Sequence, residues 1–352
     1  MVTQRPILAL VGGFLGAGKT TLILRAAGML RHDGMRVAVI TNDQDAGLVD
    51  TRLAEAHGLG AREVAGACFC CRFSGLIDAA EQLTAFRPDM IFAEPVGSCV
   101  DISATILQPL KAWHGGQWRL APYTVLVDPA RATDLHEPDV AFLFRHQIAE
   151  ADILCLTKCD RPREDAQLSV PVDYRLSATT GAGVREWLQE VVECNRVAGA
   201  RILDVDYTRY AEAEAALGWL NLQVELRLRE ALSPAALAGP LLESVDHSLT
   251  AAGIRIAHLK IFDRAATGYI KASLCDNRGE PMPEGDLTAS AAKRHELAVN
   301  LRALGDPRVL RAIVDAALSE FDATTTVKHV GAFRPAAPRP EHRFARPSEA
   351  AG

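Results

Sequence analysis

A glycine-rich stretch near the start of the chain restricts the fold more than any other feature. Residues 13–20, GFLGAGKT, match G-x-x-x-x-G-K-[ST], a loop whose backbone N–H groups turn inward around phosphate oxygens. Lys19 adds a charge for the β and γ phosphates, and the Thr20 hydroxyl can bind Mg²⁺. An accidental glycine turn would lack the buried strand and the helix that the patterns at 7–11 and 19–31 predict. The predicted phosphate-binding residues are Gly13, Gly16, Ala17, Gly18, Lys19, Thr20 and Thr21.

Buried strands and helices alternate through the first half of the chain. Short apolar runs typical of buried parallel strands lie at 7–11, 37–41, 90–93, 123–127 and 153–156. Helical patterns lie at 76–86, 102–113 and 184–194. This order predicts an α/β fold, the P-loop NTPase type, in which helices cover both faces of a parallel sheet. Ligands of such sheets bind at the carboxyl ends of the strands, where each motif below is found.

The pattern changes near residue 197. Residues 1–196 are predicted to form the nucleotide-binding domain and 197–216 a linker. Strand and helix patterns in 217–332 follow α+β order, which predicts a second, smaller domain. Residues 333–352 are rich in Pro, Ala and charge, so they are predicted to form a flexible, disordered tail with too little apolar surface to bury.

Charge and hydropathy argue against two classes of partner. A net charge of −6 over 352 residues gives no general attraction for nucleic acid or for an anionic membrane. No apolar run approaches the ~18 residues that span a bilayer. The start of the chain leads into a strand and a glycine loop, unlike a signal peptide. We expect a cytoplasmic protein and leave a homodimer open.

A carboxylate ends the strand predicted at 90–93. Glu94 and Gly97 match the D-x-x-G element of GTPases, with Glu in place of Asp. The acidic residue of that element serves the magnesium ion, and the glycine N–H can contact the γ-phosphate. We therefore expect Thr20 and Glu94 to hold Mg²⁺, and Lys19 and Glu94 to act in catalysis. The alternative is an ordinary exposed Glu at a strand end.

Two later motifs favour guanine over adenine. Thr157-Lys158-Cys159-Asp160 follows a predicted strand and resembles N-K-x-D. The Asp160 carboxylate would accept from guanine N1–H and N2–H₂, and adenine would leave it unpaired at a cost of ~1–3 kcal/mol. Lys158 would lie over the base, and the Thr157 hydroxyl would tether the loop. Ser177 and Ala178 match an S-A-x element whose backbone N–H contacts guanine O6. The alternative is two polar loops that merely end strands.

Three of the eight cysteines lie within four residues. Cys68, Cys70 and Cys71 form CFCC, whereas the other cysteines are scattered. A disulfide framework would be spread more evenly, so a reducing compartment is expected. Three thiolates suit a borderline-soft ion such as Zn²⁺ or Co²⁺, and three local ligands leave an open, exchangeable site. A redox switch and buried structural thiols are the alternatives.

In this order, GFLGAGKTTL, CFCC, E-x-x-G and T-K-C-D resemble the CobW-like GTPases, relatives of the urease and hydrogenase accessory GTPases. The resemblance covers residues 6–195 well and the second domain only in general character. It implies a nucleotide domain, a C-x-C-C metal motif and often a C-terminal α+β domain. It also implies that GTP, with Mg²⁺, controls insertion of zinc or cobalt into a client metalloprotein, whose identity the resemblance leaves unknown.

Some residues depart from that family pattern. Where the family commonly has N-E-F-G, residues 42–45 read NDQD, so either Asp43, taken as the catalytic acid, or Asp45 would approach Mg²⁺. The family's histidine-rich run is absent. Single histidines fall on predicted strands of the second domain, where a metal site and structural roles are both open; they are His258, His295 and His329.

Cys99 lies two residues after Gly97, on the segment expected to sense the γ-phosphate. A cysteine in this place can bind metal in the hydrogenase-type accessory GTPases. Tetrahedral zinc wants a fourth ligand, and Cys99 or a water would supply it. The alternative is a small residue packed under the loop.

Two other classes of function also stay open: a P-loop small-molecule kinase, and a metal or redox sensor that nucleotide only stabilises.

Overall fold

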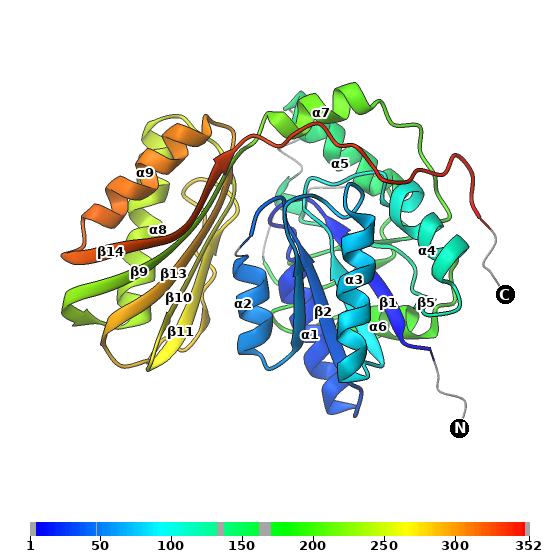
Figure 1. Ribbon diagram of the computed structural model, residues 1–352, viewed down its shortest axis with the longest axis horizontal. Coiled ribbons are helices and arrows are strands. Elements are labelled where there is room, and N and C mark those ends of the chain that lie inside the picture. Colours follow the sequence, from blue (N-terminus) through cyan, green and yellow to red (C-terminus); the bar gives the residue numbers. More distant parts are fainter. Residues whose placement is uncertain (1–4, 47, 132–136, 162–169, 349–352) are drawn as a thin grey trace. The chain divides into compact units, whose positions relative to one another are not determined.

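The computed structural model describes residues 5–46, 48–131, 137–161 and 170–348 (Figure 1). The chain forms two compact units, and each is assembled from separate stretches of sequence. Unit 1 consists of Met1–Gln44, Ala54–Ala213 and Ala337–Gly352; unit 2 consists of Asp45–Leu53 and Glu214–Ala336.

Unit 1 is built on an eight-stranded sheet in which every pairing is parallel. The order is β3-β2-β4-β1-β6-β7-β8, and β5 also pairs with β1. Its strands are β1 (Ile7–Gly13), β2 (Val37–Asn42), β3 (Gly60–Val64), β4 (Met90–Glu94), β5 (Arg119–Leu120), β6 (Thr124–Val127), β7 (Ile153–Leu156) and β8 (Tyr174–Arg175). The central strands β1, β2 and β4 are buried along their whole length, as expected for a sheet covered on both faces. The predicted α/β fold is confirmed.

Helices join these strands (Figure 1). They are α1 (Lys19–His32), α2 (Val49–Ala56), α3 (Phe73–Leu83), α4 (Gln108–His114), α5 (Pro138–Glu150), α6 (Val184–Glu193) and α7 (Tyr207–Ala215), with a 3₁₀ turn at Thr84–Phe86. The helix predicted at 102–113 begins as a π-helical segment, Ser103–Leu107, which runs into α4. Within the described ranges, none of the helices combines the length and the apolar character that crossing a bilayer requires.

Part of the predicted linker is helical. Helix α7 lies within the stretch 197–216, and its Tyr210 is fully buried. The Val100 N–H donates to the Tyr210 hydroxyl at 3.2 Å.

Unit 2 is an antiparallel sheet with two helices packed on one face (Figure 1). The strand order is β12-β11-β10-β13-β9-β14. Its elements are β9 (Gly218–Leu232), α8 (Pro234–Ala251), β10 (Ile256–Ala265), β11 (Gly268–Leu274), β12 (Glu284–Gly285), β13 (Ala292–Ala303), α9 (Pro307–Ser319) and β14 (Ala323–Phe333). Both helices start with proline after a side-chain cap, Ser233 for α8 and Asp306 for α9. The predicted α+β character of this part of the chain is confirmed.

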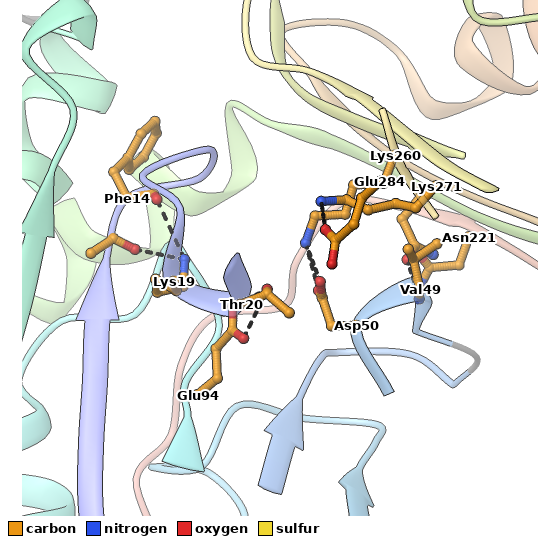
Figure 2. Close-up of polar contacts among 12 residues, drawn as sticks. Phe14, Lys19, Thr20, Val49, Asp50, Glu94, Asn221, Lys260, Lys271 and Glu284 are labelled. Carbon is orange, nitrogen blue, oxygen red and sulfur yellow. Dashed lines mark hydrogen bonds and ion pairs between the residues drawn. The ribbon is translucent and has the colours of Figure 1, made fainter. Parts of the chain in front are cut away.

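The two faces of this sheet differ in chemistry. Apolar side chains such as Leu222 and Val299 join the core formed with α8 and α9. Their neighbours along the strands are polar, and they bind the segment Asp45–Leu53, which belongs to unit 2 although it follows β2 in the sequence. The ammonium of Lys260 lies 2.5 Å from an Asp50 carboxylate oxygen (Figure 2), and the Val49 N–H donates to Asn300 Oδ1 at 2.9 Å.

The end of the chain differs from the flexible tail predicted for 333–352. The segment 337–348 is packed against unit 1. The Phe344 N–H donates to the Ala104 carbonyl at 3.0 Å, and the Ser348 N–H donates to Gln108 Oε1 at 2.7 Å. Composition alone missed this order because the partners of the segment lie more than two hundred residues away in the sequence. Residues 349–352 lie outside the described residues.

The histidines of unit 2 have local partners. The Nδ1 of His295 lies 2.7 Å from Asp263 Oδ2, its Nε2 lies 3.0 Å from the Ala292 carbonyl oxygen, and both side chains of the pair are fully buried. His329 Nε2 lies 2.8 Å from Asp45 Oδ2. Among the described residues, the group of three or more His, Cys, Asp or Glu side chains placed to hold a metal contains cysteines alone. A metal site at the histidines therefore has no support here.

The His295–Asp263 pair predicts how stability depends on pH. Burial lowers the pKa of His295, but hydrogen bonds to Asp263 and Ala292 outweigh burial and raise the pKa overall. A raised folded-state pKa stabilises the protein below the unfolded value of ~6.5, and this contribution is lost as the pH rises through the folded value. Burial also raises the pKa of Asp263, which acts in the same direction.

We therefore expect the free energy of unfolding to fall, as the pH rises above about 6.5, more steeply in the wild type than in Asp263→Asn, whose neutral amide cannot hold the extra proton. Urea unfolding across this range would measure both slopes. Equal slopes in the wild type and Asp263→Asn would contradict the raised pKa assigned to His295.

Candidate functional site

The glycine loop closes on itself through Lys19. Strand β1 ends at Gly13 and α1 begins at Lys19, whose buried ammonium donates to the carbonyl oxygens of Gly13 at 2.8 Å and Phe14 at 3.4 Å (Figure 2). Gly18, which precedes α1, has φ 93°, a left-handed conformation that favours glycine. The first turn of α1 contains no acidic residue, so its N–H groups and positive dipole end remain suited to an anion.

The remaining loop residues follow the same chain path. Gly16 has φ 79°, and the Ala17 N–H donates to the Phe14 carbonyl at 3.1 Å. Thr21 lies in the first turn of α1. The structure therefore brings all the predicted phosphate-binding residues to one strand-to-helix turn.

Thr20 and Glu94 meet at the carboxyl edge of the sheet. The Thr20 hydroxyl donates to the two Glu94 carboxylate oxygens at 2.9 and 3.1 Å, and both side chains are buried (Figure 2). Strand pairing sets this position, because Glu94 ends β4 beside β1 and β2. A hydroxyl and a carboxylate facing each other form the kind of hard oxygen set that Mg²⁺ prefers, so these residues fit the ion.

The two candidate acids after β2 have different surroundings. Asp43 directly follows β2, is buried in unit 1, and its Oδ1 accepts from the Gln44 N–H at 2.6 Å. Asp45 belongs to unit 2, where His329 lies 2.8 Å from its carboxylate. The arrangement favours Asp43 over Asp45 as the acid on the nucleotide side.

One glutamine connects Gly97 with Cys99. A Cβ added at Gly97 would lie 2.8 Å from the Leu15 side chain and 3.0 Å from the Leu15 nitrogen, so Gly97 packs directly on the phosphate loop. The buried amide of Gln147, on α5, donates to the carbonyl oxygens of Gly97 at 3.0 Å and Cys99 at 2.9 Å. Sequence reasoning missed Gln147, since it resembles any polar residue on a helix.

The predicted base loop is tied to the phosphate loop. The Thr157 hydroxyl donates to the Ala17 carbonyl at 2.9 Å, which is the tether expected of it. Lys158 has φ 56°, and its ammonium lies 2.7 Å from a carboxylate oxygen of the buried Asp128. Asp160 is exposed to solvent at the tip of the loop. Asp128 was not predicted; its position directly after β6 was the available signal.

The second predicted base element lies beside the first. Strands β7 and β8 pair, and the Cys159 N–H donates to the Leu176 carbonyl at 3.1 Å, which joins the two loops. Ser177 is buried, and its hydroxyl accepts from the Thr180 N–H at 3.0 Å. The Arg25 side chain on α1 donates to the Ala178 carbonyl at 2.8 Å. Arg25 is a further residue that sequence reasoning missed.

Three sulfur atoms gather in the CFCC loop. The Cys68 and Cys70 sulfurs are 2.9 Å apart, and those of Cys70 and Cys71 are 3.7 Å apart. All three lie within 4.8 Å of one another. Cys68 and Cys70 are buried, whereas Cys71 is half-buried. No disulfide joins any of the eight cysteines, all of which fall in described ranges.

Asn42, at the end of β2, holds this loop in place. Its amide donates to the carbonyl oxygens of Val64 and Ala67, each at 2.8 Å. Its Oδ1 accepts from the Phe69 N–H, also at 2.8 Å. One side chain thus satisfies three backbone groups around the cysteines. Sequence reasoning noted Asn42 only as part of the stretch 42–45 and did not anticipate this role.

Cys99 joins the cluster. Its thiol hydrogen-bonds with the thiols of Cys68 and Cys70, and its side chain is buried. Hydrogen bonds from Cys70, Cys71 and Cys99 hold the pKa of Cys68 well below its ordinary value. The pKa of Cys70 is raised in turn, chiefly by its hydrogen bond with Cys68. The group of side chains whose ligand atoms all lie within 4.8 Å of one another consists of Cys68, Cys70 and Cys71, so a fourth-ligand role for Cys99 stays a prediction.

The chain matches known proteins in its first half. Residues 7–182 match the family model for the CobW/HypB/UreG nucleotide-binding domain. The zinc chaperone YeiR of Escherichia coli (strain K12) is 31% identical over 164 residues, covering 45% of this chain and 48% of the relative. The zinc chaperone CobW of Pseudomonas aeruginosa is 28% identical over 246 residues, covering 59% and 60%. The matched stretches thus span about half of the YeiR chain and three fifths of the CobW chain.

A solved structure of the zinc-bound YjiA GTPase from E. coli aligns with 89% of this chain and 99% of its own, at 17% identity and a TM-score of 0.34, values too low to support an argument. The family match rests instead on the residues that carry the site. The matched stretch includes the phosphate loop, the cysteine cluster, Glu94 and both base elements. Because this stretch is half of the 352 residues, the chain belongs to the CobW/HypB/UreG family and has the P-loop GTPase fold of that family.

Proposed function

We propose that this protein hydrolyses GTP and uses the nucleotide state to control binding and delivery of a divalent transition metal to a client metalloprotein. One observation carries the proposal: a single short segment, 94–99, contacts both halves of the site. Glu94 accepts a hydrogen bond from Thr20, and Gly97 packs on Leu15 of the phosphate loop. At the other end of the segment, the Cys99 thiol hydrogen-bonds with the thiols of Cys68 and Cys70. A shift of this segment with the γ-phosphate would move one thiol relative to the others.

The proposed chemistry assigns a role to each nucleotide-side residue. Lys19 would neutralise charge on the β and γ phosphates, and the N–H groups of 13–20 would orient them. Thr20, Glu94 and Asp43 would hold or approach Mg²⁺, which supplies charge stabilisation for phosphoryl transfer. Asp160 would select guanine by accepting its two N–H donors, and Lys158, aligned by Asp128, would lie over the base.

Thiolate chemistry supports a metal as the cargo. Three or four clustered sulfurs suit Zn²⁺ or Co²⁺, and both relatives above are named zinc chaperones, so zinc is the first ion to test. A kinase would have no use for the cysteine cluster or for a guanine-specific carboxylate. A redox sensor would respond to oxidants and leave GTP turnover independent of metal.

Guanine specificity is the first expected outcome. GTP should bind at least about tenfold more tightly than ATP, because adenine leaves the Asp160 carboxylate unpaired. Asp160→Asn should move the preference toward xanthosine triphosphate, which presents an acceptor where guanine has a donor. Competition binding with the three nucleotides measures both effects; equal affinity of the wild type for GTP and ATP would remove the guanine assignment.

Loss of GTP hydrolysis in phosphate-site variants is the second expected outcome. Lys19→Ala should lower GTP hydrolysis by about a thousandfold or more and weaken binding, since the ammonium stabilises the transferring charge. Glu94→Gln should reduce hydrolysis much more than GTP affinity. Phosphate release by each variant at saturating GTP provides the measurement. Hydrolysis at the wild-type rate in Lys19→Ala would place the active site elsewhere.

Coupling between nucleotide binding and zinc binding is the third expected outcome. A non-hydrolysable GTP analogue should change zinc affinity by about tenfold relative to GDP, and zinc should change analogue affinity by the same factor, because coupling is reciprocal. Cys99→Ser should lower zinc affinity in at least one nucleotide state. Gln147→Leu should leave both ligands bound but bring the coupling factor close to one.

Gln189→Leu is the matched control, since that exposed glutamine lies on α6 and its amide donates to the Glu193 carboxylate of the same helix. Isothermal titrations of zinc with each nucleotide present compare the variants. Zinc affinity unchanged by Cys99→Ser in both states would exclude the fourth-ligand role and leave a three-cysteine site.

A further inference from the structure

The last described segment of the chain touches the cysteine cluster. The Arg339 N–H points at the Cys71 sulfur, 3.0 Å away, and the Glu341 N–H donates to the Cys70 carbonyl at 2.9 Å. Cys71 is the half-buried member of the cluster, whereas Cys68 and Cys70 are buried. The segment therefore lies against the cluster at the thiol that retains access to solvent.

Side chains on either side of these contacts anchor the segment to α3. The Glu341 carboxylate accepts from the Ser74 N–H at 3.0 Å and from the Ser74 hydroxyl at 3.1 Å, in the first turn of the helix that follows the cysteines. The ring of His342 meets Phe73 of α3 edge-on, with ring centroids 5.5 Å apart.

Further anchors reach the loop after Cys99 and helix α4. The Arg343 guanidinium lies 2.7 Å from the buried Asp101 carboxylate, two residues beyond Cys99. The rings of His342 and Phe344 lie 4.6 and 5.6 Å from that of Trp113. Figure 1 draws the segment as the red trace that passes α4 on its way to the C terminus. Its contacts thus span both loops that contribute cysteines.

From these contacts we propose that residues 337–348, here called the strap, close the cysteine site and must detach before the metal passes to another protein. This inference rests on the proposed metal function and deepens it. The Arg339 N–H orients the Cys71 sulfur from outside the ligand set, as backbone donors do around metal-bound thiolates. The strap blocks the approach of a competing ligand to Cys71.

The Glu341–Ser74 anchor is of a kind that can be released without unfolding the core. Glu341 and Ser74 are solvent-exposed, and the strap consists largely of proline, alanine and charged residues. Exposed ion pairs and hydrogen bonds exchange readily with water. Release of the Arg343–Asp101 pair would act on the loop that contains Cys99. Detachment of the strap and a change of nucleotide would therefore both affect the position of the Cys99 thiol.

The test compares the full chain with a variant that lacks residues 337–352. In the metal-free proteins, alkylation by iodoacetamide is followed at each cysteine by peptide mass spectrometry. Cys71 should react at least about fivefold faster without the strap, since the strap covers part of this thiol and its Arg339 N–H contacts the sulfur. Cys159 is exposed on the base loop and should react equally in both proteins, which makes it an internal standard.

A second arm uses zinc. Transfer of zinc from each loaded protein to a chromophoric chelator should be faster without the strap by a similar factor. A synthetic peptide of residues 337–352 added to the shortened protein should slow both alkylation and transfer again. If the full chain binds no zinc, the proposed function fails, while the alkylation arm still decides on the strap.

Point variants guard against misfolding of the shortened chain. Glu341→Ala removes the anchor at Ser74 and should increase Cys71 alkylation, whereas Arg346→Ala, at an exposed position of the same segment, should not. Binding of GTP by each variant verifies the fold. Equal rates of Cys71 alkylation in the full chain, the shortened chain and Glu341→Ala would overturn the proposal that the strap closes the cysteine site.

Discussion

The parallel pairing of β2, β4 and β1 places the whole candidate site at one edge of a sheet. Thr41 pairs with Glu94, and Leu10 pairs with Ala93, so the three strands end at nearly the same level. The last residues of these strands are Asn42 beside the cysteine loop, Glu94 beside Thr20, and Gly13 at the start of the phosphate loop. Backbone hydrogen bonds of the sheet thus set the spacing between the nucleotide side and the sulfur side.

Much of the fold could be predicted from the sequence because its central strands are short apolar runs, and the phosphate loop, Glu94 and the Thr157–Asp160 element lie at the ends of three of them. The strong signals were local: glycines at a strand-to-helix turn, a carboxylate at a strand end, and three cysteines within four residues. The roles of Asn42 and Gln147 could not be predicted, since each acts by bridging backbone groups that are far apart in sequence. Such partners are visible only once the chain is folded.

The order of the C-terminal segment was missed for a related reason. Its composition is typical of disorder, because proline, alanine and charge provide little apolar surface of their own. A few aromatic and charged side chains nevertheless find partners on α3, α4 and the loop after Cys99. The density of anchors, rather than the average hydropathy, decides whether such a segment is held.

Two stretches of chain are exchanged between the units: Asp45–Leu53 lies in unit 2, and the residues from Ala337 onward lie in unit 1. Neither unit is therefore continuous in sequence, and no single cut of the gene yields a complete copy of either. A fragment that ends after α7 would contain every nucleotide and cysteine motif but would lack the segment that lies against Cys71. Separate expression of either half must therefore account for a segment that belongs to the other unit.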